Sequence, residues 1–383
     1  METAPGRVER LYKPANLHLV AEMPEDSAQE VAAAFFNRWI TVGVSKDAPA
    51  DFEAVLRSVH GLAPLETAHV KKLYETLAKL DAERGWVNRR DYQFTPTLFY
   101  ALAEALSSAK QSDDGWRSGG EQGYRRWLLS AFAREARRLV GARLSPDASA
   151  TAIPDCERFE RVLKIVLGVK QLPASDTALR LEDKGLLALA GAAPVAKTAE
   201  ALPLAQAARE SGVAVTSEFA KAFAFLARAD ALGKASALVG ETGAGKTSVA
   251  EMWAKLTGRR FYKYQSHAGS ELGDLTVDVE QEESGEFKKR VREFYDQLRK
   301  GHVVIDIDEA NVAPWVLWAL EPVLRGERRV YPMFPEEPPF DIGEGVQVIL
   351  TFNPERYAGR NKIDPRLMDS LLVAWVGAPS PEE

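Results

Sequence analysis

The sequence has a single cysteine, Cys156, among 383 residues. One thiol cannot build a framework of intramolecular disulfides, and it cannot supply a cysteine-rich zinc site. The chain also lacks any run of about 18 apolar residues, the length that crosses a membrane as a helix. Its first residues do not follow the basic-then-apolar pattern of a secretory signal. These absences predict a cytoplasmic protein with no membrane-spanning helix.

A marked excess of basic residues is missing as well. The chain has 49 lysines and arginines against 55 aspartates and glutamates, a formal net charge of −6. This balance argues against a protein whose whole surface binds nucleic acid. One segment is locally basic, because Tyr124-Arg-Arg-Trp127 is followed by Arg134, Arg137 and Arg138. It can contact nucleic acid or an acidic partner, although the solvated face of an amphipathic helix explains the pattern equally well.

Helical patterns fill the first half of the chain. Thr95 followed by Pro96 predicts a helix start, because threonine is a capping residue and proline suits the first helical position. Residues 171–212 are punctuated by alanine and proline, which predicts a linker with short helical pieces. The spacing of apolar residues predicts further helices over 27–39, 67–80, 121–140, 156–167 and 218–232.

From about residue 213, predicted strands and helices alternate. The expected strands are 235–239, 302–307 and 346–352, and the expected helices between them are 248–257 and 312–325. This order is typical of an α/β fold in which helices flank a parallel sheet. The sequence therefore predicts an all-α N-terminal domain (1–145), a helical segment and linker (146–212), and an α/β domain (213–383).

A glycine-rich loop joins the first of these strands to a helix. Strand, glycine loop and helix start form the context of a phosphate-binding loop, whose backbone N–H groups point at anionic oxygens. Lys246 can reach the terminal phosphates, and the Thr247 hydroxyl can ligate magnesium. We therefore expect a nucleoside triphosphate site that takes ATP and Mg²⁺. Its predicted binding residues are Gly240, Glu241, Thr242, Gly243, Ala244, Gly245, Lys246, Thr247 and Ser248.

Polar side chains end the next two predicted strands. Asp308 can hold the magnesium ion together with Thr247, and Glu309 can act as a catalytic base on an attacking water. Asp306 lies two positions before Asp308 and so on the same strand face, which leaves an exchange of roles open. Asn353 can orient the water near the γ-phosphate, or it can simply begin a turn before a proline.

The order and spacing of these motifs resemble the AAA+ ATPases, and within them the MoxR-like and dynein-related (midasin-like) group. The resemblance covers about 213–376. It implies a P-loop core with Asn353 as the sensor-1 residue and with hairpins over 276–288 and 327–346. The stretches that carry it are Val239-Gly-Glu-Thr-Gly-Ala-Gly-Lys-Thr247, Leu272-Gly-Asp-Leu275, Ile305-Asp-Ile-Asp-Glu-Ala-Asn311, Ala319-Leu-Glu-Pro-Val-Leu324, Thr351-Phe-Asn-Pro354 and Gly359-Arg-Asn-Lys-Ile-Asp-Pro-Arg-Leu-Met-Asp369.

The same resemblance carries an implication about assembly. Members of the family form hexameric rings, so we expect a homo-oligomer. These rings remodel partner proteins, and the partners often carry a metal-binding von Willebrand-type domain. The sequence itself does not identify the partner.

Two departures from the family pattern bear on catalysis. The pattern ends in Asp-Arg-Phe, whose arginine reaches the neighbouring subunit's nucleotide, but here the run is Asp369-Ser370-Leu371. Such an arginine is worth about 10³–10⁵ in rate. Arg366 is the first candidate for a substitute, followed by Arg360 and Arg356. Few residues follow Ser370, so the helical lid and its sensor-2 arginine are not expected in this sequence; either the sequence stops before the lid or another chain supplies it.

Three functions remain as hypotheses. The first is an ATPase that couples ATP turnover in a ring to remodelling of a partner. The second is a nucleotide-gated scaffold with little hydrolysis, which Ser370 and the missing lid favour. The third is a nucleic-acid-associated motor, which only the basic segment supports. Asn361-Lys-Ile-Asp364 matches a guanine-reading motif, but it follows Tyr-Ala-Gly-Arg instead of an apolar strand, so ATP is the better prediction.

Overall fold

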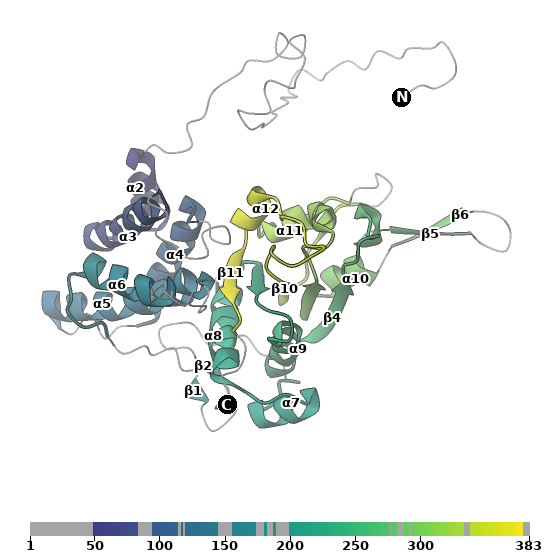
Figure 1. The fold of residues 1–383 in the computed structure, drawn as a ribbon, viewed down its shortest axis with the longest axis horizontal. Coiled ribbons are helices and arrows are strands. Elements are labelled where there is room, and N and C mark those ends of the chain that lie inside the picture. Colours follow the sequence, from purple (N-terminus) through teal and green to yellow (C-terminus); the bar gives the residue numbers. More distant parts are fainter. Residues whose placement is uncertain are drawn as a thin grey trace, which may run out of the picture. The chain divides into compact units, whose positions relative to one another are not determined.

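A computed structural model gives the fold of the chain (Figure 1). From Pro49 onward the chain forms one compact unit. The helix predicted over 27–39 lies outside the described residues. The structure describes residues 49–82, 94–113, 116–117, 119–144, 155–173, 180–181, 187–188, 199–275, 277–281, 287–291, 293–332 and 338–377.

The described part of the chain between residues 49 and 173 contains helices and no strand. The helices predicted there are confirmed, with ends that differ by a few residues. Thr95 has the extended backbone of an N-cap residue, but its hydroxyl donates to Asp369 and accepts no backbone N–H of its own helix. The elements are α2 (Pro49–Ser58), α3 (Pro64–Ala82), α4 (Pro96–Ser112), α5 (Gly120–Leu139), the 3₁₀ turn η4 (Gly141–Arg143) and α6 (Asp155–Leu167).

Arginines of the locally basic segment point into the protein. Glu135 of α5 is fully buried and accepts from Arg134 at 3.1 Å, Arg138 at 3.2 Å and Arg228 at 2.8 Å. Arg137 donates to a glutamate of α6 at 2.7 Å. The expected solvated face is therefore wrong for Arg134, Arg137 and Arg138. Helical spacing alone could not reveal that one buried carboxylate gathers several guanidinium groups.

A five-stranded sheet forms the centre of the second half, in the order β11-β3-β10-β7-β4. Every pair of neighbours in it is parallel. The three predicted strands are confirmed as β3 (Ser236–Val239), β7 (Val303–Asp308) and β10 (Val346–Phe352). The sequence analysis missed β4 (Arg260–Gln265) and β11 (Leu372–Trp375).

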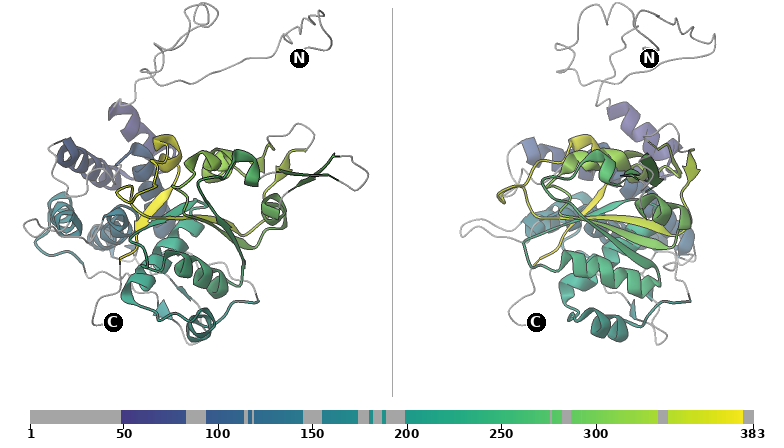
Figure 2. Two further views of the ribbon diagram at one scale, coloured as in Figure 1. Left: turned by 45° about the vertical axis from the view of Figure 1, so that its right-hand side comes forward. Right: turned by 90° about the vertical axis from the view of Figure 1, so that its right-hand side faces the viewer.

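Helices cover both faces of this sheet (Figure 2). One face packs against α8 (Ser217–Ala231) and α9 (Lys246–Thr257), and α7 (Leu204–Ser211) packs on α9. The other face packs against α10 (Glu293–Lys300), the 3₁₀ helix η6 (Pro314–Leu320) and α11 (Glu321–Leu324). The expected α/β architecture with an all-helical N-terminal region is confirmed.

The helix expected over 312–325 differs from its prediction. Residues 314–320 form a 3₁₀ helix, and only residues 321–324 are α-helical. Pro322 explains the break, because proline has no N–H to donate and its ring clashes with the preceding turn. The sequence predicted a helical segment here but not the type of helix.

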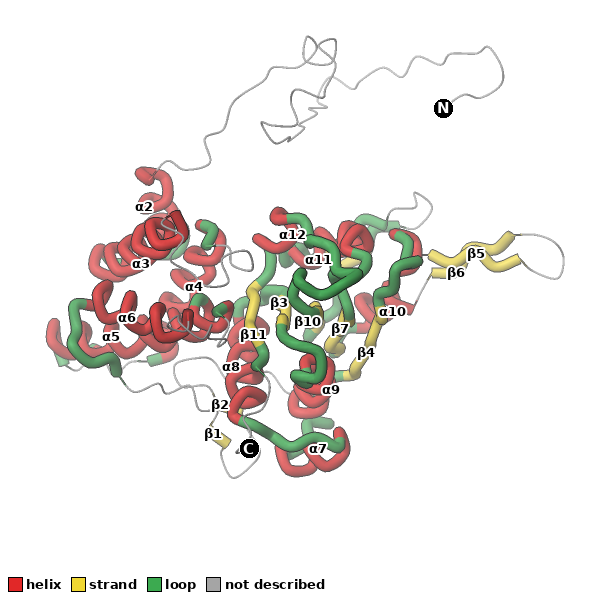
Figure 3. Tube along the Cα trace, in the orientation of Figure 1, coloured by secondary structure: helices red, strands yellow, loops and turns green. Residues whose placement is uncertain are grey.

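Short hairpins extend from the sheet (Figure 3). β5 (Val277–Gln281) pairs antiparallel with β6 (Phe287–Val291), and β8 (Arg329–Val330) pairs antiparallel with β9 (Phe340–Asp341). Both fall where the family resemblance implied hairpins. A third, unexpected pair is β1 (Arg180–Leu181) with β2 (Leu187–Ala188). Two short turns, η5 (Leu272–Leu275) and α12 (Pro365–Asp369), complete the described elements.

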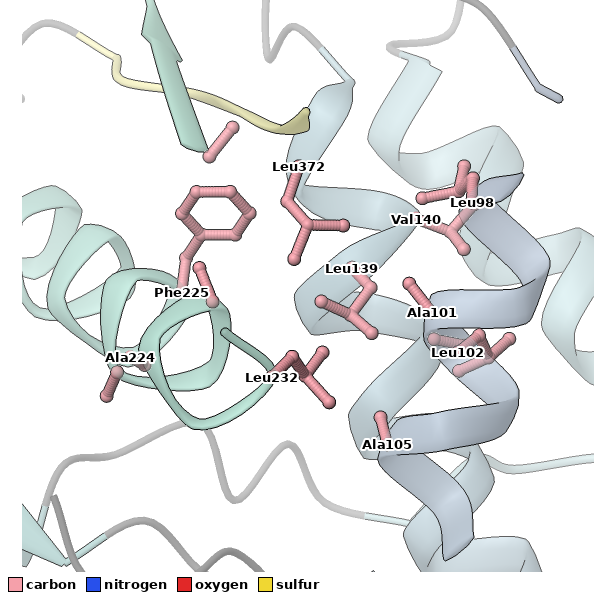
Figure 4. Packing of buried hydrophobic residues seen from close by; sticks show 14 of the residues in the cluster. Leu98, Ala101, Leu102, Ala105, Leu139, Val140, Ala224, Phe225, Leu232 and Leu372 are labelled. Atoms are coloured by element: carbon pink, nitrogen blue, oxygen red, sulfur yellow. The ribbon is translucent and has the colours of Figure 1, made fainter. Parts of the chain in front are cut away.

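The N-terminal helices and the sheet share one apolar core. Figure 4 shows Leu98 and Leu102 of α4 and Leu139 near the end of α5 on one side, with Phe225 of α8 and Leu372 of β11 facing them. All five side chains are at most 3% exposed. The helical region therefore packs directly on the edge of the sheet that β11 forms.

Candidate nucleotide-binding site

The glycine-rich loop lies at the C-terminal end of β3, directly before α9 (Figure 3). Gly243 and Gly245 both have φ of +82°, which other residues rarely adopt. At Gly240 a Cβ atom would lie 2.2 Å from the carbonyl oxygen of Val376, so a side chain cannot fit there. The first turn of α9 leaves N–H groups without helical acceptors, which suits an anion. The local geometry is that of a phosphate-binding loop.

Lys246 links this loop to the end of β10. Its Nζ donates to the carbonyl oxygens of Gly240 and Glu241, each at 2.9 Å, and to Oδ1 of Asn353 at 2.8 Å. Burial lowers the pKa of Lys246, while the carboxylates of Glu309 and Asp308 oppose that shift. The structure thus brings together two predicted site residues that are far apart in the sequence.

Asp308 lies at the end of β7, the strand next to β10 in the sheet. Its Oδ1 is 3.3 Å from the Thr247 hydroxyl and 2.9 Å from the Thr351 hydroxyl. Its Oδ2 is 2.6 Å from the ammonium of Lys263 on β4. A carboxylate and a hydroxyl that meet beside a phosphate-binding loop are the ligands that Mg²⁺ uses in such sites, with water and phosphate oxygens completing its shell. The contact of Oδ2 with the lysine ammonium shows that this carboxylate already binds a cation. The side chains of Thr247 and Asp308 therefore fit a magnesium ion.

Asp306 is fully buried beside Asp308. The Thr351 hydroxyl lies 2.9 Å from a carboxylate oxygen of each aspartate, so both share one face of β7, as the alternation predicts. Burial and, to a smaller extent, the charge of Asp308 raise the pKa of Asp306 to about 8. A carboxyl group that is neutral at pH 7 is a poor metal ligand, which favours Asp308 for that role.

Glu309 follows with a φ of +56°, a conformation that costs free energy in a residue other than glycine. Its Oε2 lies 2.6 Å from a guanidinium nitrogen of Arg360, and its Oε1 lies 3.4 Å from Nδ2 of Asn353. The Arg360 side chain is only 18% exposed. In this structure the predicted catalytic base is therefore paired with an arginine of the same chain.

The three candidate arginines occupy different places. Arg360 contacts Glu309, and Arg356 contacts Glu241 of the glycine-rich loop. Arg366, the first candidate from the sequence, pairs with Asp364 at 3.0 Å and lies over an indole ring, with 59% of its side chain exposed. The structure brings Arg360 into the chain's own site and leaves Arg366 at the surface.

The guanine-reading motif does not form a base-binding edge. The Asn361 side chain donates to a backbone carbonyl oxygen at 2.8 Å, and the Asp364 side chain caps α12. Both residues follow a loop and not a strand. The polar groups of Asn361 and Asp364 therefore make hydrogen bonds within the protein.

Comparison with known families agrees with this geometry. Residues 236–371 match the family model of the AAA domain (dynein-related subfamily). This part of the chain is a AAA domain of the dynein-related subfamily. The matched range begins at β3 and ends after α12, so the AAA domain contains the glycine-rich loop, both carboxylates and Asn353.

A solved structure gives a weaker likeness. It is the crystal structure of a "putative ATPase" from Cytophaga hutchinsonii, with 16% identity and a TM-score of 0.34. The match covers 47% of this chain and 52% of that one, so the chain spans about half the length of that protein.

In the described part of the chain, every helix is too short or too polar to cross a bilayer.

Proposed function

We propose that this chain binds ATP with Mg²⁺ through its AAA domain and hydrolyses it. One observation carries the proposal: the Lys246 ammonium lies 2.8 Å from Oδ1 of Asn353, beside Glu309 and the glycine-rich loop. Three separate elements thereby deliver a phosphate-binding cation, a polar amide and a carboxylate to one place. This is the set of groups that phosphoryl transfer to water requires.

The residues have distinct roles in the proposed reaction. The loop N–H groups and Lys246 hold the phosphates, and Thr247 and Asp308 hold the metal ion. Bound Mg²⁺ would neutralise charge that develops on the phosphate oxygens. Glu309 accepts a proton from the attacking water while Asn353 orients that water.

The supply of a catalytic arginine is the part of this proposal in which the chain departs from the family pattern. Arg360 is the candidate that would act on the nucleotide of its own chain, because its guanidinium lies at Glu309. Arg366 would have to act on the nucleotide of a neighbouring copy, and its exposure is compatible with that. For turnover, Glu309 must first leave its ion pair with Arg360.

We further propose the assembly, location and partner that the family resemblance implies. The chain would assemble into a cytoplasmic, MoxR-like ring that remodels a partner protein, with a partner that carries a von Willebrand-type domain as one candidate. The helical N-terminal domain (1–145) would recruit that partner, with 146–212 as the connecting segment and 213–383 as the ATPase core. A nucleic-acid motor loses its main support, because arginines of the basic segment are paired inside the protein.

A nucleotide-gated scaffold with little hydrolysis is the second candidate. Two observations favour it: Ser370 stands at the expected arginine position, and Glu309 is held by Arg360. In this alternative, ATP binding changes the structure and turnover is negligible.

Steady-state ATP hydrolysis separates the two candidates. The Glu309→Gln variant keeps the size of the side chain but removes the base, so we expect ATP binding to persist and turnover to fall at least about 100-fold. Assembly mass should be measured in parallel, since Arg366 can act only between copies. Wild-type turnover no higher than that of Glu309→Gln, with ATP still bound, would contradict hydrolysis and leave the scaffold.

A further inference from the structure

Lys263 takes no part in the chemistry described above, although it touches the centre of the site. It lies on β4, which pairs with β7 so that Lys263 is opposite Asp306 and Gln265 is opposite Asp308. Paired residues of neighbouring strands share a face, so Lys263 projects from the same face as both aspartates. Its Nζ is 2.6 Å from Oδ2 of Asp308.

The lysine is one of several groups of this chain that contact the Asp308 carboxylate. Oδ1 of Asp308 lies within 3.3 Å of the hydroxyls of Thr247 and Thr351, and it accepts the backbone N–H of Glu309 at 3.0 Å. Oδ2 faces the lysine ammonium. Both oxygens of Asp308 are therefore occupied by groups of this chain. A metal ion that approaches Oδ2 therefore competes with the lysine ammonium for that oxygen.

The ion pair can open. The Lys263 side chain is 37% exposed, while that of Asp308 is only 14% exposed. A long, half-exposed lysine can swing into solvent, whereas the carboxylate is fixed by its hydrogen bonds. Two cations that compete for one carboxylate also repel each other, and this repulsion is strong where water is partly excluded.

We propose that Lys263 is a tethered cation that competes with Mg²⁺ for Asp308. Its ammonium neutralises the carboxylate when no metal is bound, and it must leave Oδ2 when the metal binds. The inference rests on the proposed function, since it requires a site for a nucleotide and its metal. It makes Lys263 a residue that sets the metal dependence of nucleotide binding.

Two effects of opposite sign follow from this role. Without metal, the ammonium reduces the repulsion between Asp308 and the nucleotide phosphates, so it helps metal-free ATP to bind. With metal, the same ammonium raises the Mg²⁺ concentration that binding requires. A lysine that only contacts phosphate, or only stabilises the fold, would shift the affinity for metal-free ATP and the affinity for Mg²⁺ in the same direction.

The test is calorimetric titration of the full chain with ATP, in EDTA and over a series of Mg²⁺ concentrations. For Lys263→Met, which keeps an unbranched apolar stem, we expect the half-saturating Mg²⁺ concentration to fall about tenfold. The affinity for ATP in EDTA should fall about tenfold, so the affinities for Mg²⁺ and for metal-free ATP change in opposite directions. Lys263→Arg keeps the charge and should stay within about threefold of wild type on both measures.

Lys71→Met serves as the matched control. Lys71 on α3 pairs with Glu53 at 3.1 Å, with exposures of 34% and 32%, and should leave both quantities unchanged. If wild type binds ATP but Lys263→Met moves neither quantity, or moves both affinities in one direction, the inference is wrong and the proposed function stands. If wild type binds no ATP at any Mg²⁺ concentration, the proposed function itself fails.

Discussion

At the residue scale, the site contains one charged and one neutral aspartate side by side. Asp306 and Asp308 share the hydroxyl of Thr351, but only Asp306 is fully buried. Burial raises its pKa to about 8, so at neutral pH the pair carries mainly the single charge of Asp308. The neutral carboxyl can donate its proton to the Thr351 oxygen, which leaves the hydroxyl proton for Asp308. The sequence predicted the shared face, but the difference in charge depends on burial that only the fold reveals.

Asp306 also makes folding stability depend on pH. Its pKa rises from 3.8 to about 8 on folding, so the folded state binds more protons between these values. Stability should therefore fall as pH rises from about 4 to about 8. Asp306→Asn cannot ionise, so it should remove a pH dependence of the unfolding free energy worth about 5 kcal/mol over that interval.

Urea denaturation of the nucleotide-free protein at pH 5.5 and pH 8 measures this effect. We expect the stability of wild type to decrease more between the two pH values than that of Asp306→Asn. Equal decreases would mean that Asp306 is already ionised in the folded protein.

At the element scale, the sequence predicted the interior of the sheet and missed its edges. β3, β7 and β10 are buried and read as apolar runs, whereas β4 and β11 are the two edge strands. β4 mixes charged, aromatic and amide side chains without a regular order, so it carries no strong strand pattern. Missing β4 is also why the sequence analysis did not find Lys263. The contact of Lys263 with Asp308 can be inferred only once β4 is known to pair with β7.

The junction between the helical region and α12 gives a prediction at this scale. A guanidinium nitrogen of Arg143, in η4, donates to the carbonyl oxygen of Leu371 at 3.0 Å, and Thr97 donates to Asp369 at 2.8 Å. Burial lowers the pKa of Arg143 to about 10, with Asp369 opposing that shift, so the arginine stays charged at pH 7. Arg143→Met should lower the free energy of unfolding by about 2–3 kcal/mol, because it leaves a carbonyl oxygen without its donor.

Chemical denaturation measures that loss, and Arg125→Met is the matched control. Arg125 pairs with Glu121 on the surface of α5, with exposures of 64% and 77%. Removing such a pair should change stability by less than about 0.5 kcal/mol. Equal effects of the two substitutions would mean that the Arg143 contact does not hold the junction together.

At the scale of the whole molecule, the AAA domain and the helical region are joined through a shared core. Arg228 of α8 and Glu135 of α5 are both fully buried and pair at 2.8 Å. The motifs predicted the nucleotide-binding half because phosphate binding restricts both residue types and spacing. The role of the helical half could not be predicted, because amphipathic spacing records burial and not the identity of a partner. Ring assembly, partner and domain borders stay predictions.

The measurement that tests the central claim most directly is ATP binding to the purified chain in saturating Mg²⁺, compared with Lys246→Ala. The Lys246 ammonium lies in the predicted phosphate-binding loop and donates hydrogen bonds of 2.9 Å to two of its carbonyl oxygens. We expect wild type to bind ATP and the variant to bind it at least about 100-fold more weakly, with a cooperative thermal unfolding transition in both proteins as the folding control. Equal affinity of the two proteins, or no binding by wild type, would contradict the assignment of this loop as the nucleotide site.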